Sequence, residues 1–484
     1  MTAEETLAVL DHHPQVTRHG YAQTQTATVR GSHHHPDTRT HRDHHGHLAG
    51  SLNLINARRS YFHWSGPLAA RLSRTPTRGV KVTPVTARSA VTVAACLMIL
   101  TATVEGSHAL SIDSSFGTNG YVTIDASPTD ETSFVISGAD GSSYVGVAPS
   151  TGAGGFVARL SANGTLDSGY GTAGRASVHA RLGGLDPVGR LLIVDSDSRV
   201  ARLTSSGQID GSFGAGGYSP QVAGSPMGLA VDRKGRTLVT SQRNVNSVGK
   251  FLVTRFTAVG TVDRSYGKRG TAVVSLGGSD HPYDIAVDAK GRAVVVGDSS
   301  HGYGRNNGRV GVIRLNGHGR LDTKFGTKGR LLLKQADQGM DVSIAGQSIY
   351  ISINKDQKWV GALKVTSKGR LDKHFGRKGV VKAQHHATAV TSIAVHAGQV
   401  VVGANVIATG DGKGNAYTTT GALATYSTRG KLIARASLGL PPTAGIAVST
   451  IAISSTGQVL VGGDTAVSPS APWPTDSYVA RLNR

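Results

Sequence analysis

The chain of 484 residues contains a single cysteine, Cys96, so no disulfide bond can form within it. Glutamate is missing after Glu131, which excludes any reaction in residues 132–484 that needs a glutamate acid or base or a cysteine nucleophile. Charged residues reach only 17% and aromatic residues 5%, whereas glycine is abundant at 64 residues. Because a glycine costs a helix interior roughly 1 kcal/mol relative to alanine, this composition disfavours helices. With 38% apolar residues the chain can still build a core, and we expect an all-β protein rich in turns.

Residues 1–87 differ from the rest of the chain. They hold eleven of the 20 histidines and scattered arginines, and they show no sustained apolar period. A segment of this composition cannot bury enough apolar surface to fold, so it is predicted to be a disordered, basic leader, or upstream sequence read from a misassigned start codon. A metal-binding histidine tract is the alternative interpretation.

Residues 88–109 have the three parts of a secretory signal. A basic flank ends at Arg88, residues 89–104 are uncharged and mostly apolar, and a small-x-small site ends at Ala109. Cleavage after Ala109 is therefore predicted. The 16-residue apolar stretch falls slightly short of the ~20 residues of a comfortable membrane span, so a retained membrane anchor remains the alternative. Both interpretations place residues 110–484 outside the cytoplasm.

The remainder of the chain is one motif repeated. Copies such as IDSSFGTNGYV, LDSGYGTAGRA and LDTKFGTKGRL begin at Ile112, Leu166, Ile209, Val262, Leu321 and Leu371, and a decayed copy begins at Gly430. Between them recur an apolar strand of the type VARL and a two-strand pattern around a glycine turn, each in seven copies. Seven units of about 50 residues with four strands each predict a seven-bladed β-propeller over residues 110–484. The final YVARLNR should meet the first aromatic turn and close the ring.

The repeated LD-x-x-[FY]-G-x-x-G, followed by A-V-D-x-x-G-R and V-x-R-L, resembles the delta-60 repeat family of bacterial secreted propeller proteins. The resemblance covers residues 110–484 and implies the propeller fold. It brings no established catalytic residues.

Two residues of each copy are expected to serve the scaffold. The aspartates should accept N–H groups within their own turns, although a ring of acidic cation ligands is the alternative. The aromatic side chains should fill the space between neighbouring blades. The predicted structural residues are Asp113, Phe116, Asp167, Tyr170, Asp210, Phe213, Asp263, Tyr266, Asp322, Phe325, Asp372 and Phe375.

Candidate chemical groups are few. His281 with Asp280 and Asp284 is the best local acid–base cluster, and Asp195 with Asp197 could touch Ca²⁺ but lack the ligand count of a tight site. His385-His386 is the one adjacent histidine pair after residue 109. No catalytic residue, metal site or cofactor is predicted.

Positive charge is distributed unevenly. Residues 232–382 contain 28 Lys and Arg against 11 Asp, a net charge of +17, whereas the rest of residues 110–484 is close to neutral. Because equivalent turns of a propeller lie on one rim, the basic turn residues should form an arc of positive potential there. The candidate ligand-binding residues are Lys268, Arg269, Lys328, Arg330, Arg377 and Lys378.

These features predict an exported, non-enzymatic and monomeric propeller, secreted or associated with the cell envelope. It would act as a binding or structural module whose basic rim docks an anionic wall polymer, an acidic glycan, lipid headgroups or a protein partner. A merely solvated rim is the alternative for the charge. Nucleic acid is not expected as a partner, and membrane contact would come only through an uncleaved N-terminal segment. The alternative function is an extracellular hydrolase, lactonase or lyase at the mouth of the channel, which would require Asp and His side chains from several blades to converge there.

Overall fold

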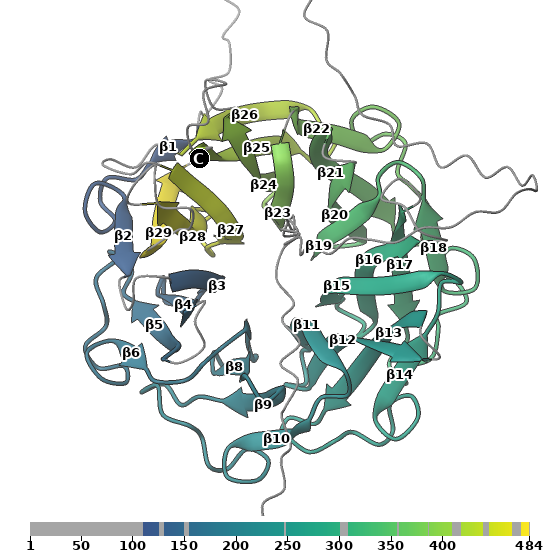
Figure 1. Cartoon of the computed structure of the whole chain (residues 1–484), viewed down its shortest axis with the longest axis horizontal. Helices are drawn as coiled ribbons and strands as arrows, with labels where there is room; N and C mark the ends of the chain where they lie inside the picture. The colour runs from purple at the N-terminus through teal and green to yellow at the C-terminus, as the bar shows by residue number, and fades with distance from the viewer. Residues whose placement is uncertain are drawn as a thin grey trace, which may run out of the picture. The chain divides into compact units, whose positions relative to one another are not determined.

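A computed structural model describes residues 110–124, 130–149, 154–245, 248–300, 308–355, 358–385, 387–408, 418–438, 445–466 and 476–483. The predicted leader and signal segment lie outside these ranges. The regular structure within them is β-strand, arranged in seven antiparallel sheets that stand side by side in a ring (Figure 1). The predicted seven-bladed β-propeller is confirmed. In the described part of the chain no helix has the length and apolar character needed to span a membrane.

The first four blades follow the chain order. Blade 1 consists of β3 (Asp130–Ser137), β4 (Ser143–Pro149), β5 (Phe156–Leu160) and β6 (Arg175–Ala176). Blade 2 consists of β7 (Leu182–Leu185), β8 (Leu191–Val194), β9 (Arg199–Arg202) and β10 (Tyr218–Gln221). Blade 3 consists of β11 (Ser225–Val231), β12 (Thr237–Val245), β13 (Val248–Phe256) and β14 (Thr271–Val274). Blade 4 consists of β15 (Ser279–Val287), β16 (Ala293–Ser300), β17 (Gly308–Leu315) and β18 (Arg330–Leu333).

The last three blades include the closure of the ring. Blade 5 consists of β19 (Gln338–Ala345), β20 (Ser348–Lys355), β21 (Trp359–Thr366) and β22 (Val380–His385). Blade 6 consists of β23 (Ala387–His396), β24 (Gln399–Ala408), β25 (Thr418–Ser427) and β26 (Leu432–Ser437). Blade 7 consists of β27 (Gly445–Ile453), β28 (Val459–Ala466) and β29 (Asp476–Asn483), together with β1 (Ser111–Ile112) and β2 (Tyr121–Ile124).

The ring closes by strand pairing between distant parts of the chain. β2 runs antiparallel to β29, with Tyr121 opposite Ala480 and Ile124 opposite Ser477, and β1 pairs further along β29. The outermost strand of blade 7 thus comes from the N-terminal part of the propeller, as the sequence predicted. Pairing covers the edge of β29, which would otherwise expose unpaired backbone groups.

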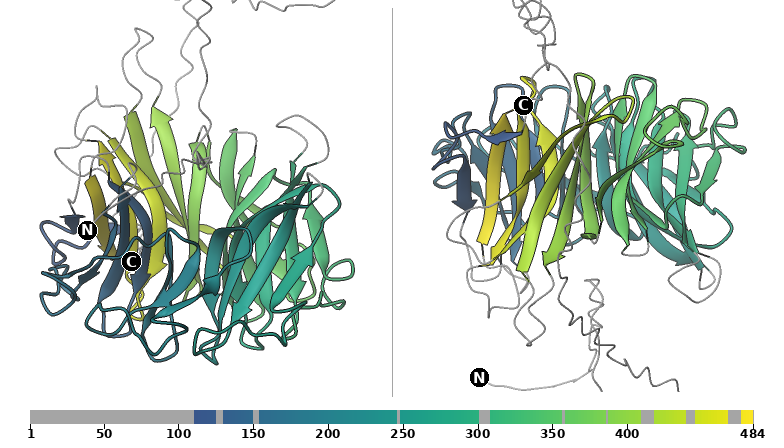
Figure 2. Two further views of the ribbon diagram at one scale, coloured as in Figure 1. Left: turned by 60° about the horizontal axis from the view of Figure 1, so that its bottom comes forward. Right: turned by 90° about the horizontal axis from the view of Figure 1, so that it is seen from above.

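Antiparallel order gives the propeller two different faces. The first strand of each blade lies nearest the centre of the ring and the last lies on the outside (Figure 1). The turn between the first and second strands and the connection between the third and fourth strands therefore lie at the same end of a blade, as the side views show (Figure 2). We call this end the turn face, and it carries all the repeated aromatic loops.

The core lies between blades. Each of seven apolar clusters combines strands of two neighbouring blades; one, for example, joins Phe251 and Val253 of blade 3 to Val295 and Ile313 of blade 4. The innermost strands carry β-bulges, where the ladder of hydrogen bonds is interrupted. Side chains of the preceding blade accept N–H groups beside these bulges. Asp284 Oδ2 accepts from Val342 at 3.1 Å, Asp341 Oδ2 from Ile393 at 2.8 Å, Asn405 Oδ1 from Val448 at 2.7 Å and Asp464 Oδ1 from Thr132 at 2.7 Å.

Candidate functional site

The repeated aspartates are engaged inside their own loops. In blade 3, Asp263 Oδ1 accepts the Ser265 N–H at 3.1 Å and its Oδ2 accepts Arg255 Nε at 2.9 Å. Hydrogen bonds from Ser115, Ser212 or the loop N–H groups, together with the neighbouring cations, hold the pKa values of several of these carboxyls below their usual range, and that of Asp210 falls to about 2. The same turn contact is made by Asp113, Asp167, Asp210, Asp322 and Asp372. The carboxylates therefore serve the loops that contain them.

In five blades the basic residue of the V-x-R-L strand joins the repeat loop to the next blade. Arg255 is buried, its guanidinium carbon lies 4.3 Å from the centre of the Tyr266 ring, and its Nη1 donates to the Gly317 carbonyl of blade 4 at 2.7 Å. Arg202, Arg314 and Arg481 make the same three kinds of contact with their own loop and the following blade. The sequence shows the motif but does not indicate this role.

The repeated aromatic side chains pack under the turn of the next blade. Phe116, Tyr170, Phe213, Tyr266, Phe325 and Phe375 are all essentially inaccessible to solvent. A Cβ at Gly319 of blade 4 would lie 2.9 Å from the Tyr266 ring, so only glycine allows this close approach.

A backbone hydrogen bond joins each repeat loop to the turn of the following blade. We call each such junction a seam. In three seams the Gly267, Gly326 and Gly376 N–H groups donate to the carbonyls of His318, Lys368 and Arg429, each at 2.9 Å. In three others the equivalent bonds run from Gly117 to Asn163, from Gly171 to Ser206 and from Gly214 to Val259. The six seams thus share one backbone arrangement on the turn face.

The predicted rim residues lie on these loops, with one exception. Lys268, Arg269, Lys328, Arg377 and Lys378 are exposed on the turn face, in the loops of blades 3, 4 and 5. Arg330 is half-buried at the start of β18, and its Nε donates to the Ser275 carbonyl at 2.9 Å. Arg330 is therefore tied into the scaffold and does not share the exposure of the other five.

Further cations on the turn face were missed because they belong to the next repeat. The turns that receive the hydrogen bonds add the exposed side chains of Arg320, Lys368, Arg370, Arg429 and Lys431. Together with the five exposed loop residues they place ten Lys or Arg side chains in the seams of blades 3/4, 4/5 and 5/6. None of the ten forms an ion pair with any residue that the structure describes. The sequence signal that could have found them is a glycine followed by Arg or Lys, as in HGR, KGR and RGK, just after the third strands of blades 4, 5 and 6.

A hollow of about 430 Å³ lies in the turn of blade 5. Lys368, Arg370, Lys373 and His374 line it, together with Asp372. The Asp372 carboxylate is compensated by Lys364 Nζ at 3.0 Å. The hollow therefore has a positive lining and adjoins the blade 4/5 seam.

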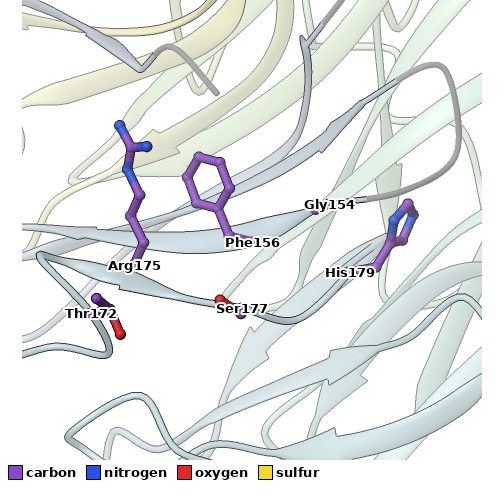
Figure 3. A pocket seen from close by; sticks show the side chains of 7 residues that line it. Gly154, Phe156, Thr172, Arg175, Ser177 and His179 are labelled. Carbon is purple, nitrogen blue, oxygen red and sulfur yellow. The ribbon is translucent and has the colours of Figure 1, made fainter. Parts of the chain in front are cut away.

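A second hollow of about 440 Å³ lies at the edge of blade 1 (Figure 3). Phe156, Thr172, Arg175, Ser177 and His179 line it, with the Arg175 guanidinium 4.9 Å from the Phe156 ring centre. Burial and the neighbouring Arg181 lower the pKa of His179. The described residues that line this hollow include no carboxylate.

The predicted acid–base cluster is separated by the pleat and by the bulge of β15. His281 Nδ1 lies 3.5 Å from Asp298 Oδ2, and hydrogen bonding to Asp298 raises the pKa of His281. Asp280 is fully buried and accepts the Leu276 N–H and the Ser299 hydroxyl. Asp284 points to blade 5, where burial and the nearby Asp341 carboxyl raise its pKa well above its usual value. The three residues therefore serve three different contacts.

The remaining candidate metal ligands from the sequence do not form a site among the described residues. Asp195 and Asp197 both pair with Arg199, at 2.8 and 2.9 Å, which leaves them ill suited to Ca²⁺. The side chains of the His385-His386 pair lie outside the described part of the structure. Among the described residues no three His, Cys, Asp or Glu side chains are grouped so that they could hold a metal ion.

No family model and no curated protein matches the chain. Solved structures resemble it only distantly. YCF48 bound to a D1 peptide has 11% identity and a TM-score of 0.40, covering 76% of this chain and 99% of that chain. BamB from Moraxella catarrhalis has 10% identity and a TM-score of 0.38, covering 73% and 85%. A gluconolactonase from Xanthomonas campestris has 14% identity and a TM-score of 0.32, covering 62% and 85%. At these values the similarities say nothing about function.

Proposed function

We propose that this β-propeller is an exported, non-enzymatic binding module that docks a polyanion at the cell envelope through its turn face. One observation carries the proposal: the three neighbouring seams hold ten exposed Lys and Arg side chains, none of which forms an ion pair with a residue that the structure describes. Exposed charges of one sign that lie close together raise the local concentration of an oppositely charged partner.

The aspartates of the repeat loops do not neutralise the exposed cations of the seams. The acidic groups of the same loops, Asp263, Asp322 and Asp372, are already neutralised by Arg255, Arg314 and Lys364. The exposed cations of the seams therefore form no ion pair with these carboxylates or with any other residue that the structure describes. Export is supported by the signal-like segment that precedes the propeller and by the resemblance to secreted repeat proteins.

A salt-dependent pull-down on isolated cell envelope tests the proposal. The purified protein should bind at low ionic strength and elute at high salt, because salt screens interactions between exposed charges. A five-site variant, Lys268→Thr, Arg269→Ala, Lys328→Asn, Arg377→Thr and Lys378→Ala, should bind at least tenfold more weakly. Absence of binding at low salt, or equal binding by the variant, would overturn the proposal.

A further inference from the structure

The six seams share one backbone geometry but fall into two classes of charge. At four equivalent positions, the seams of blades 7/1, 1/2 and 2/3 carry Thr118, Asn119, Asn163, Thr165; Thr172, Ala173, Ser206, Gln208; and Ala215, Gly216, Val259, Thr261. The seams of blades 3/4, 4/5 and 5/6 carry Lys268, Arg269, His318, Arg320; Thr327, Lys328, Lys368, Arg370; and Arg377, Lys378, Arg429, Lys431. Because neutral residues build the same junction three times, the fold does not require the cations of the other three.

From this contrast we propose that the three basic seams are equivalent subsites for successive phosphate groups of one linear phosphodiester polymer. The inference rests on the proposed function and names its ligand. In each seam the cations come from two segments that a backbone hydrogen bond holds together, as Arg377 and Lys378 are held beside Arg429. A phosphodiester presents oxygen acceptors in several directions and stays charged at every physiological pH, so it can bridge donors from both segments. Arginine, present in each of the three seams, adds a planar fork that matches phosphate.

The succession of the three basic seams around the ring favours a chain as the ligand. The hollow of about 430 Å³ beside the blade 4/5 seam is lined by Lys368, Arg370, Lys373 and His374. A single polymer strand laid across this hollow can contact these cations together. The three seams follow one another around the ring, so a strand leaving one seam reaches the next on the same face.

Binding of poly(glycerol phosphate) of defined lengths tests the inference. Affinity should rise steeply with length while the polymer gains a second and a third seam, and then level off, because each further subsite is engaged at high effective concentration. The substitutions for the basic seams are taken from the equivalent positions of the neutral seams. Lys328→Asn copies the loop with Asn119, and Lys268→Thr with Arg269→Ala copies the loop with Ala173; these templates adopt the same positive φ. Each seam neutralised should lower the affinity for the long polymer several-fold and shorten the length at which affinity levels off.

The controls separate the inference from the proposed function. Arg233→Gln with Lys234→Gln removes two exposed charges outside the three seams and should change affinity less than twofold. Polyglutamate of matched charge should bind at least fivefold more weakly than the phosphodiester, and vesicles with anionic lipid should not bind more tightly than the polymer. Equal loss in the Arg233/Lys234 variant, equal binding of polyglutamate or tighter binding to vesicles would overturn the phosphodiester subsites while leaving a polyanion-binding module. Loss of all salt-sensitive envelope binding would instead overturn the proposed function.

Discussion

One position between neighbouring blades shows that an amide and a carboxyl can make the same contact. Asn405 of blade 6 and Asp464 of blade 7 occupy equivalent places in their second strands, and each accepts an N–H group from the innermost strand of the next blade. Burial raises the pKa of Asp464 to about 7, whereas the ordinary value is 3.8. The native state therefore retains a proton that the unfolded chain releases between about pH 4 and pH 7.

Asp464→Asn should remove this pH dependence. In the native protein the free energy of unfolding should fall as pH rises through that window, because the folded state binds more protons than the unfolded state. The loss should amount to a few kcal/mol, since one pKa unit corresponds to about 1.4 kcal/mol. The variant keeps the acceptor for Thr132 and should be more stable at pH 8. Urea unfolding at pH 5 and pH 8 measures the effect, with Asp140→Asn as an exposed control; an unchanged difference between the two pH values would contradict it.

The Arg202–Asp210 pair allows the contribution of the arginine–aspartate contact to the free energy of unfolding to be measured. Arg202 is buried and is the cation that pairs with Asp210, at 2.7 Å, among the described residues. Arg202→Met should cost about 3–5 kcal/mol because it leaves a partly buried carboxylate without its partner. The double variant Arg202→Met/Asp210→Asn should lose less than the sum of the single variants, since the amide keeps the Ser212 contact without a charge. Strict additivity in urea unfolding would show that the two side chains are not coupled.

At the scale of elements, the decayed repeat in blade 6 has a structural reason. Thr425, Ile433 and Ala436 stand where other blades have the arginine, the aspartate and the aromatic residue. The partner of this loop would be a tight turn after β29 in blade 7. No such turn joins β29 to its outer neighbour, because β2 comes from the distant N-terminal part of the propeller. The arginine, the aspartate and the aromatic residue are therefore absent from the loop for which the next blade offers no turn to contact.

The closing strand is predicted to be essential for the fold of blade 7. Deleting residues 111–124 would uncover the edge of β29 and remove Asp113 and Phe116, the partners of Arg481. We expect a lower midpoint and a broader transition in thermal unfolding, together with faster amide exchange in β29. Deleting 14 residues from the leader instead, such as residues 30–43, should leave these properties unchanged. A sharp transition in the 111–124 deletion would mean that blade 7 holds without its outer strand.

The sequence predicted the number of blades, the loops and the ring closure because those features are local and repeated. It did not predict contacts that depend on how blades face each other. The bulge in β15 sends Asp284 towards Asp341 and separates it from His281, and no local pattern marks the bulged residue. Arg330 follows the second glycine of its loop, whereas the exposed residues lie between the two glycines, and its side chain donates to the Ser275 carbonyl.

At the scale of the whole molecule, the ten exposed cations of the three basic seams gather on one face and in one part of the ring. Blades 3 to 5 and the turn of blade 6 carry the exposed cations, whereas the equivalent turns of blades 1, 2 and 7 are neutral. Such asymmetry orients a protein towards a polyanion before contact, and the effect weakens as salt is added. A bound polymer should therefore cover the turn face and leave the opposite face open.

The rate of lysine acetylation can show which face a bound polymer covers. Two lysines, one before and one after β18, allow the two faces to be compared. Lys328 precedes the strand on the turn face and Lys334 follows it at the opposite end; both are exposed and neither forms an ion pair with a described residue. Saturating poly(glycerol phosphate) should lower the acetylation rate of Lys328 several-fold, as measured by peptide mass spectrometry, and should leave that of Lys334 unchanged. Equal protection of both lysines would indicate a ligand wrapped around the whole blade, and protection of Lys334 alone would place the docking surface on the other face. Because the two lysines flank one strand and are both exposed, a difference between them reports the face that the polymer covers and not a change in the stability of blade 4.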